Sequence, residues 1–178
     1  NTVANVAFTG NGSSVANAVS FANDGTLALG PGTLTFNGGL TTSSVGGTVT
    51  LSQGGSALTL VTSNDAVVLG AVTLAGATIV NTNASDTTGD ITIGAVTGGS
   101  NNLSLSTGDN ISGADITASG AISLGTLGLE NVGGTATFSG DVDITSLEHN
   151  STVANIAFTG NGSSFANAES FVNDGTLQ

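Results

Sequence analysis

The chain has 178 residues, contains no Lys, Arg, Cys, Trp or Tyr, and carries a formal charge of −12 at pH 7. A chain without cations cannot neutralise phosphates or be attracted to anionic lipid surfaces, so this composition excludes nucleic-acid binding and electrostatic membrane binding. No apolar run approaches the roughly 20 residues that a transmembrane helix needs, and no membrane span is expected in this segment. Without cysteine there are no disulfides, so rigidity must come from packing and backbone hydrogen bonds.

Short segments in which apolar and polar residues alternate follow one another along the chain. Each is about three to six residues long, rich in Val, Ile and Thr, and bounded by Gly, Asn, Asp or Ser. The period of two and the β-branched residues are typical of strands, and the bounding residues are typical of turns. In chain order the segments, together with the turn residues that bound them, lie within residues 25–32, 32–39, 47–55, 56–65, 66–80, 89–99, 102–110, 120–129, 134–141 and 142–150. No stretch has the period and the end signals of a helix, so the chain is predicted to be all-β.

The length of these segments favours a parallel β-helix, or β-solenoid, with short strands. Strands so short would form poor sandwich sheets, and the large aromatic anchor typical of a sandwich is missing. In a solenoid each inward residue stacks on a similar residue about 4.8 Å away in the next coil. Three strands per coil predict about six coils in residues 1–150, with the seven Phe residues as occasional fillers. Tandem β-sandwich repeats are the alternative fold.

One segment of the chain occurs twice. Residues 2–27 and 152–177 are offset by 150 positions and are identical at 22 of 26, the differences being Val6/Ile156, Val15/Phe165, Val19/Glu169 and Ala22/Val172. Such repetition indicates an array. We therefore expect residues 1–150 to be one repeat unit and residues 151–178 to begin the next, as part of a longer tandem protein. Alternatively, the chain is complete and its matching ends stack head to tail between molecules.

The stretch from Gly89 to Leu129, GDITIGAVTGGSNNLSLSTGDNISGADITASGAISLGTLGL, resembles the repeat regions of large secreted bacterial β-helical proteins. These are the filamentous-haemagglutinin-type adhesins and related autotransporter passengers. The cation-poor composition, rich in Thr, Ala, Gly and Asn, is also similar to that of bacterial surface-layer proteins. Both resemblances imply an extracellular structural role. A chain without Lys or Arg offers no cleavage site to trypsin-like proteases, which fits either selection outside the cell or drift in a lineage with acidic surface proteins.

The residues offer few candidates for catalysis. His149, the only His, would have to serve any Ser–His–Asp arrangement, with Ser146 or Ser151 nearby, although a His after a strand is usually a solvated surface residue. Asp141 and Asp143 are predicted to point to the same side of a strand at roughly 7 Å, a separation compatible with glycoside hydrolysis. The chemistry of polysaccharide lyases relies on Lys or Arg and is excluded. We expect no catalytic site, no bound cofactor and no enzyme activity.

Acidic residues near turns suggest loose or specific Ca²⁺ binding as a weak possibility, since carboxylate and amide oxygens suit this ion. Turn chemistry alone explains most of them, and we expect no defined metal site. The candidates are Asp24, Asp65, Asp86, Asp90, Asp109, Asp115 and Asp174.

Pairs of threonines, such as Thr33/Thr35 and Thr48/Thr50, raise an ice-binding alternative, but this would require the same pair on every coil.

The sequence thus predicts a structural unit of a long extracellular fibre, such as a surface filament, adhesin stalk, sheath or biofilm matrix. Its expected partner is itself, in tandem or head-to-tail copies. A glycan- or receptor-binding adhesin module is the alternative, with a surface-layer lattice protein or a polysaccharide-active enzyme behind it.

Overall fold

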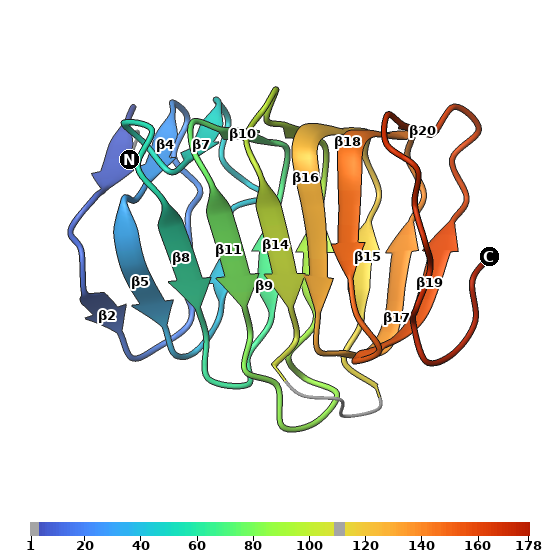
Figure 1. The fold of residues 1–178 in the computed structure, drawn as a ribbon. Coiled ribbons are helices and arrows are strands. Elements are labelled where there is room, and N and C mark those ends of the chain that lie inside the picture. The colour runs from blue at the N-terminus through green and yellow to red at the C-terminus, as the bar shows by residue number, and fades with distance from the viewer. Residues whose placement is uncertain (1–3, 109–112) are drawn as a thin grey trace.

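In the computed structural model, residues 4–108 and 113–178 are described, and within them the chain forms twenty β-strands and no helix. Every strand pair is parallel, and the chain winds as a β-solenoid (Figure 1). This confirms the predicted all-β parallel solenoid. The sandwich alternative is wrong, because the described strands pair in parallel and do not form face-to-face antiparallel sheets. Each coil has three strand positions, and we refer to them as the first, second and third faces.

The first face begins each coil. It contains β1 (Val6–Phe8), β4 (Leu27–Leu29), β7 (Val49–Leu51), β10 (Val72–Leu74), β13 (Val96–Thr97), the first halves of β16 (Ile122–Glu130) and β18 (Val142–His149), and β20 (Ser164–Phe165). The second face contains β2 (Ser13–Val15), β5 (Gly32–Phe36), β8 (Leu58–Val61), β11 (Thr78–Asn81), β14 (Leu103–Ser106) and the second halves of β16 and β18. β16 and β18 thus each run continuously across the corner between the two faces.

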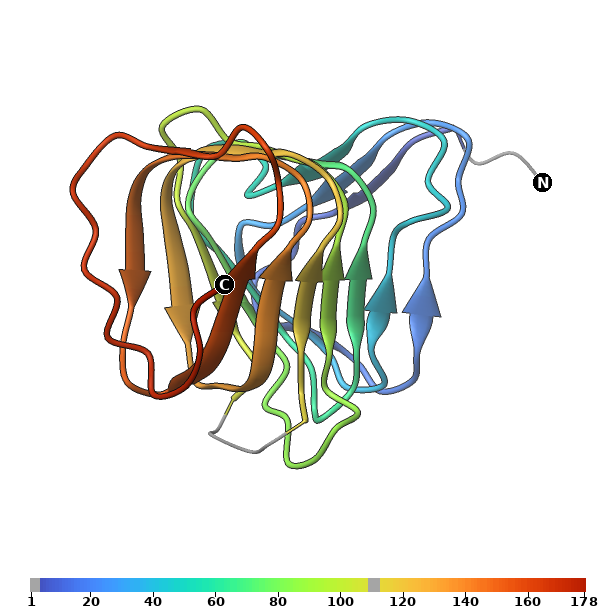
Figure 2. The same ribbon diagram turned by 90° about the vertical axis from the view of Figure 1, so that its right-hand side faces the viewer.

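The third face is a separate sheet of seven strands. It contains β3 (Val19–Ser20), β6 (Leu40–Thr41), β9 (Val67–Leu69), β12 (Ile91–Ile93), β15 (Ile116–Ala118), β17 (Val132–Phe138) and β19 (Val153–Phe158). Seven strands on this face mean seven coils. Six of these strands lie within residues 1–150, for which the sequence predicted about six coils, and the seventh, β19, follows them. An eighth coil begins with β20. Figure 2 views the stack from its C-terminal end, where this last coil, in red, lies nearest the viewer.

The interior is built from ladders of like residues, as the sequence predicted. On the first face Leu27 lies between Val6 and Val49, and the same ladder continues to Val72 and beyond. Leu27 is fully buried, as is nearly every inward residue of the middle coils. Each such Leu, Ile or Val contributes about 1.5–3 kcal/mol from burial, so stacked coils stabilise one another. The core is therefore continuous along the whole axis.

Phenylalanines fill the wider places between these ladders. Phe36 and Phe138 are fully buried, and Phe138 stacks on Phe158 of the next coil with ring centroids 5.2 Å apart. Phe158 also meets the ring of Phe165 edge-on at 5.3 Å. The aromatic stack thus links the last three coils, and it agrees with the predicted role of Phe as filler.

In several coils the corner between the second and third faces has a left-handed backbone. Asn64, Asn83 and Asn131, each placed soon after a second-face strand, have φ values of 69°, 47° and 51°. Asn tolerates this conformation better than other residues with a side chain, because its short amide can bond locally. The asparagines therefore allow the chain to turn sharply where one face ends and the next begins.

Coil length varies at the corners. On the first face, the coil from Val96 to Ile122 is longer than the coil from Ile122 to Val142 that follows it, yet the strands stay in register. The corners thus absorb the extra residues without disturbing the ladders.

None of the described residues forms a helix long and apolar enough to cross a membrane.

Candidate functional site

Asn and Asp side chains beside the strands act as clamps between coils. The Oδ1 atom of each accepts a hydrogen bond from a backbone N–H about one coil later in the chain. Thr26 donates to Asn5 at 2.9 Å, Thr126 to Asn102 at 3.1 Å, and Thr135 to Asp115 at 2.7 Å. The same bond joins Thr33 to Asn11, Ser85 to Asn64, Asp115 to Asp90, Gly162 to Asp141, and Thr176 to Asn155. These side chains extend the hydrogen-bond ladder beyond the ends of the short strands.

These bonds between coils give a structural role to several of the carboxylates that the sequence offered as candidates for catalysis or Ca²⁺ binding. Asp141 and Asp143 both lie on the exposed side of the first face, as the alternation predicted. Asp141 Oδ1 accepts the Gly162 N–H at 2.8 Å, so one of the two carboxylates already serves the next coil. Asp143 stands opposite Ser123 on one neighbouring strand and Ser164 on the other. Both carboxylates thus lie on the exposed side of a sheet, between neighbouring coils.

His149 does not form a catalytic arrangement with the described residues. Its ring stacks on Phe171 with centroids 5.3 Å apart, and among those residues neither ring nitrogen has a hydrogen-bond partner. The Ser146 hydroxyl instead accepts a bond from the Asn167 side chain at 2.8 Å. His149 is half-buried under the eighth coil, contrary to the solvated surface position that its place after a strand suggested.

The carboxylates considered for Ca²⁺ do not gather. Within residues 4–108 and 113–178 there is no group of three or more His, Asp or Glu side chains that could hold a metal ion. Asp109 lies outside the described residues. Asp86 instead closes a local turn, because its Oδ1 accepts bonds from both the hydroxyl and the N–H of Thr88, at 2.7 and 2.8 Å. These hydrogen bonds, that of the Thr88 hydroxyl first, lower the pKa of Asp86 from its ordinary value.

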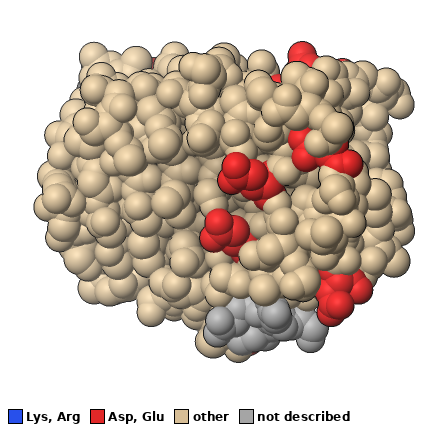
Figure 3. Space-filling model, viewed as in Figure 1, with Lys and Arg blue, Asp and Glu red and all other residues tan. Residues whose placement is uncertain are grey.

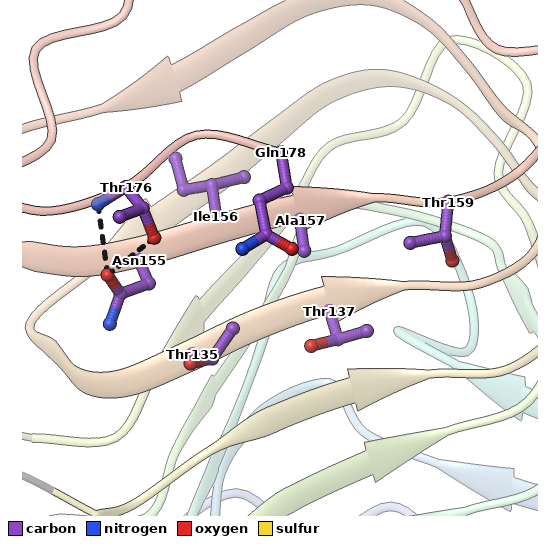
Figure 4. A pocket seen from close by; sticks show the side chains of 8 residues that line it. All are labelled: Thr135, Thr137, Asn155, Ile156, Ala157, Thr159, Thr176 and Gln178. Carbon is purple, nitrogen blue, oxygen red and sulfur yellow. Dashed lines mark hydrogen bonds between the residues drawn. The ribbon is translucent and has the colours of Figure 1, made fainter.

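The hollows on the surface are shallow and lie on the sheet faces. One, on the third face near the C-terminal end, has a volume of about 390 Å³ and is bordered by hydroxyls, amides and small apolar groups (Figure 4). It is lined by Thr135, Thr137, Asn155, Ile156, Ala157, Thr159, Thr176 and Gln178. Thr176 donates both its N–H and its hydroxyl to Asn155 Oδ1, each at 2.9 Å. These polar groups are therefore partly occupied by the clamp between coils.

Outward threonines form ladders that the sequence did not reveal. On the first face Thr50, Thr73 and Thr97 stand directly opposite one another on consecutive coils, followed by Ser123. The pairs singled out in the sequence do not recur on every coil, because Ala71 and Ala95 occupy the position of Thr48 in the next two coils. The ladder was hidden because its members are separated by unequal numbers of residues. A single row of threonines is not the paired array that ice binding would require.

The charge is unevenly distributed along the axis. Of the twelve acidic residues, only Asp24 and Asp65 precede residue 85. On the face seen in Figure 3, the acidic side chains accordingly gather over the C-terminal half, while the N-terminal half is free of charge. The unit therefore has a nearly neutral end and an acidic end.

The two copies of the repeated segment form the same coil. In the first, Val6 pairs with Leu27 and its N–H donates to the Thr26 carbonyl at 2.8 Å. In the second, Ile156 pairs with Leu177 and its N–H donates to the Thr176 carbonyl at 3.0 Å. The clamps Asn5–Thr26 and Asn155–Thr176 match, and so do the bonds from Asn23 and Asn173 to those same threonine carbonyls, at 2.9 and 3.1 Å.

The same coil nevertheless starts on a different face in each copy. Val6 lies in β1 on the first face, whereas Ile156 lies in β19 on the third face. Ser14 accordingly belongs to the second face and its equivalent, Ser164, to the first. The two segments therefore wind in the same way but start on different faces of the solenoid.

No protein-family model, curated protein sequence or solved structure is significantly similar to this chain.

Proposed function

We propose that the chain is a structural unit of a long extracellular β-solenoid fibre, assembled through continuous or head-to-tail stacking of the repeat unit. The observation that carries the proposal is the repeated coil. The cross-coil bond from the Thr26 N–H to Asn5, at 2.9 Å, recurs in the second copy at Asn155, also at 2.9 Å. The local bond from Asn23 to the carbonyl three residues later, at 2.9 Å, recurs at Asn173, at 3.1 Å. A coil that is built in the same way at both ends of a unit lets the hydrogen-bond ladder continue from one unit to the next without an exposed edge.

Two further features support this role. Unpaired strand edges are templates for association, and the last coil has Phe171, Val172 and Leu177 partly exposed beside such an edge. The flat outer faces carry small hydroxyl side chains and no cations, which would keep neighbouring fibres apart through a net negative charge. Freedom from trypsin-like cleavage supports a place outside the cell.

The experiment compares charge placed on the edge with charge placed on a side of the solenoid. The purified chain should associate end to end as its concentration rises, giving filaments one solenoid wide in electron micrographs. Fibre diffraction should show a reflection at about 4.8 Å along the filament axis. Leu177→Asp should suppress this association, whereas Thr97→Asp, on the outer side of the first face, should leave it unchanged. A chain that stays monomeric at millimolar concentration, or equal effects of the two variants, would contradict the proposal.

The adhesin alternative is favoured only by the hollow that Figure 4 depicts, whose hydroxyls and amides could bind a glycan. Binding of oligosaccharides that Thr137→Val abolishes, with no tendency to assemble, would favour this second function.

A further inference from the structure

The number of strands in a repeat decides how the next repeat is oriented. From β1, which holds Val6, the chain advances by twenty strand positions to reach β19, which holds Ile156, when each half of β16 and of β18 is counted as one position. Three positions make one coil, and twenty is not a multiple of three. The repeat therefore advances by six and two-thirds coils, which agrees with the move of the copied segment from the first face to the third.

The copied segment winds in the same way on either face. It closes one coil from Val6 to Leu27 and again from Ile156 to Leu177. The glycine in each copy makes the same close approach, since a Cβ on Gly25 or on Gly175 would overlap the carbonyl oxygen of Ala4 or Ala154. Winding is thus determined by the local sequence and not by the face on which the sequence starts.

We propose that the last coil receives the second coil of a following copy of the repeat, and that each copy is consequently turned by one face relative to the copy before it. This inference rests on the proposed fibre function, because it describes how units follow one another in the fibre. Three repeats, or twenty coils, then bring the chain back to its starting face. At about 4.8 Å per coil, one repeat rises by about 32 Å and the structure repeats after about 96 Å.

The open edge of the last coil identifies the segment that would cover it. Residues 164–177 form this edge, and they are the copies of residues 14–27. Within the chain, residues 14–27 are covered by β5, β6 and β7, where Ser14 is opposite Thr35, Val19 is opposite Leu40, and Leu27 is opposite Val49. The complementary partner of the edge is therefore the part of the continuing repeat that corresponds to residues 32–51, in a register that this chain already contains.

The exposure of equivalent residues agrees with a missing layer. Leu27 is 0% exposed because Val49 lies above it, whereas Leu177, its copy, is 47% exposed. Phe171, whose equivalent Phe21 is half-buried, is 37% exposed at the rim of the edge. A segment like residues 32–51 would cover this surface.

The turn distributes the surface features of one repeat over all sides of the fibre. The acidic half of each unit recurs at every repeat, about 32 Å apart, but Asp143 of successive units would lie on the first, third and second faces in turn. A given side of the fibre thus shows the same residues only at every third unit. A ligand bound to one outer face would be spaced by about 96 Å along that side.

A crosslink within the existing chain tests the turn by itself. The chain has no cysteine, and Asp143 and Ser164 are directly opposite each other on β18 and β20 with both side chains exposed. Cα atoms on adjacent strands are about 4.8 Å apart, which a disulfide can bridge. Oxidation should therefore crosslink the variant Asp143→Cys/Ser164→Cys.

The control is the pair that an unturned copy would bring together. If residues 152–177 occupied the faces that residues 2–27 occupy, Ser164 would continue the ladder of Ser14 through Thr35 and Glu130, and would lie opposite Asn150. Crosslinking of Asn150→Cys/Ser164→Cys in preference to Asp143→Cys/Ser164→Cys would overturn the inference, even if the chain formed fibres.

A longer chain tests the stacking of whole units. The sequence is continued after Leu177 with further copies of residues 28–177, and its filaments are measured by electron diffraction. An axial repeat of about 96 Å supports the inference, whereas a repeat of about 32–34 Å overturns it. The two experiments can also disagree. If the Asp143–Ser164 crosslink forms but the units of the longer chain fold separately and do not stack, the turn between the two copies is supported. The fibre function, and the stacking of the next coil on the last one, are then rejected.

Discussion

The two copies of the repeated segment differ more in their neighbours than in their sequence. The first copy supports a complete coil on one side, so its Leu27 is buried and its Val19 pairs with Leu40. The second copy begins with β19 of the seventh coil and ends in an open edge, so Leu177 is half exposed. Both still close the same coil with the same clamps. The comparison separates what local sequence determines, the path of one coil, from what stacking supplies, the burial of its apolar side chains.

The strongest test of this comparison truncates the same leucine in both copies. Leu27→Ala should lower the free energy of unfolding by roughly 2–5 kcal/mol, because it leaves a cavity between Val6 and Val49. Leu177→Ala should cost less than about 1 kcal/mol, because the side chain is already half in water. Denaturant unfolding at low protein concentration measures both values. Equal losses would mean that the two leucines are equally covered, contrary to the difference between the copies.

The next test restores the most divergent residue of the second copy. Glu169 stands where the first copy has Val19, and its carboxylate accepts the Leu147 N–H at 2.9 Å, a donor on the strand edge. Glu169→Val should cost about 1–2 kcal/mol by leaving that N–H without its partner. It should also increase end-to-end association several-fold in sedimentation experiments, because an inward charge on an edge opposes further pairing.

The control for this substitution is Glu169→Gln, which keeps an acceptor oxygen and removes the charge. It should preserve most of the stability while association still rises. Equal losses of stability in the Gln and Val variants would show that the bond to Leu147 contributes nothing.

A smaller effect is expected from removing the clamps, and it should be similar in both copies. Asn5→Ala and Asn155→Ala each remove the acceptor for a threonine N–H and hydroxyl, so each should cost about 0.5–1.5 kcal/mol. Asn5→Asp and Asn155→Asp retain the Oδ1 acceptor and should cost less. Hydrogen exchange at Thr26 and Thr176 measures the local effect. Protection lost at one threonine and kept at the other would break the equivalence of the copies.

The smallest effect is a local response to acid at a turn that lies in neither copy. The hydrogen bonds from Thr88 lower the folded-state pKa of Asp86 below the ordinary 3.8. The stabilisation of this turn is therefore complete above the ordinary pKa and is lost as the pH falls through the lower folded-state value. In an NMR titration the chemical shift of the Thr88 amide should change as the pH falls through that folded-state pKa.

The copies provide the control for this titration. Thr26 and Thr176 donate to amide oxygens of Asn, which do not titrate, and their signals should stay in place through the same pH range. The substitution Asp86→Asn should abolish the shift at Thr88. If all three threonine signals moved together, acid would be loosening the whole stack, and the clamps would not be independent.

The sequence predicted the features that depend on short-range patterns. Alternation in segments such as residues 47–55 indicated the strands, and Phe was expected as interior filler. Near-identity of two segments predicted that they would form the same coil. Each of these follows from residues close together in the chain, where propensity and turn chemistry act.

The orientation of the second copy and the role of the acidic residues could not be predicted in this way. Coils differ in length, as those on either side of Ile122 do, so the length of a repeat does not translate into a known number of faces. Asp141 and Asp115 bond backbone groups 21 and 20 residues away, so their structural role appears only when coils are placed in register. The same holds for the outward row of threonines on the first face.

The corners have a consequence for how such a protein can change. The corner between β11 and β12, residues 82–90, and the shorter one between β5 and β6, residues 37–39, join the same two faces. Extra residues at a corner lengthen the repeat without adding a strand, and the direction in which the next unit points stays the same. Gain or loss of one strand would instead redirect every later unit by one face. Loop insertions are thus neutral for the symmetry of the fibre, whereas deletion of a single strand, which leaves nineteen positions per repeat, would change its screw axis.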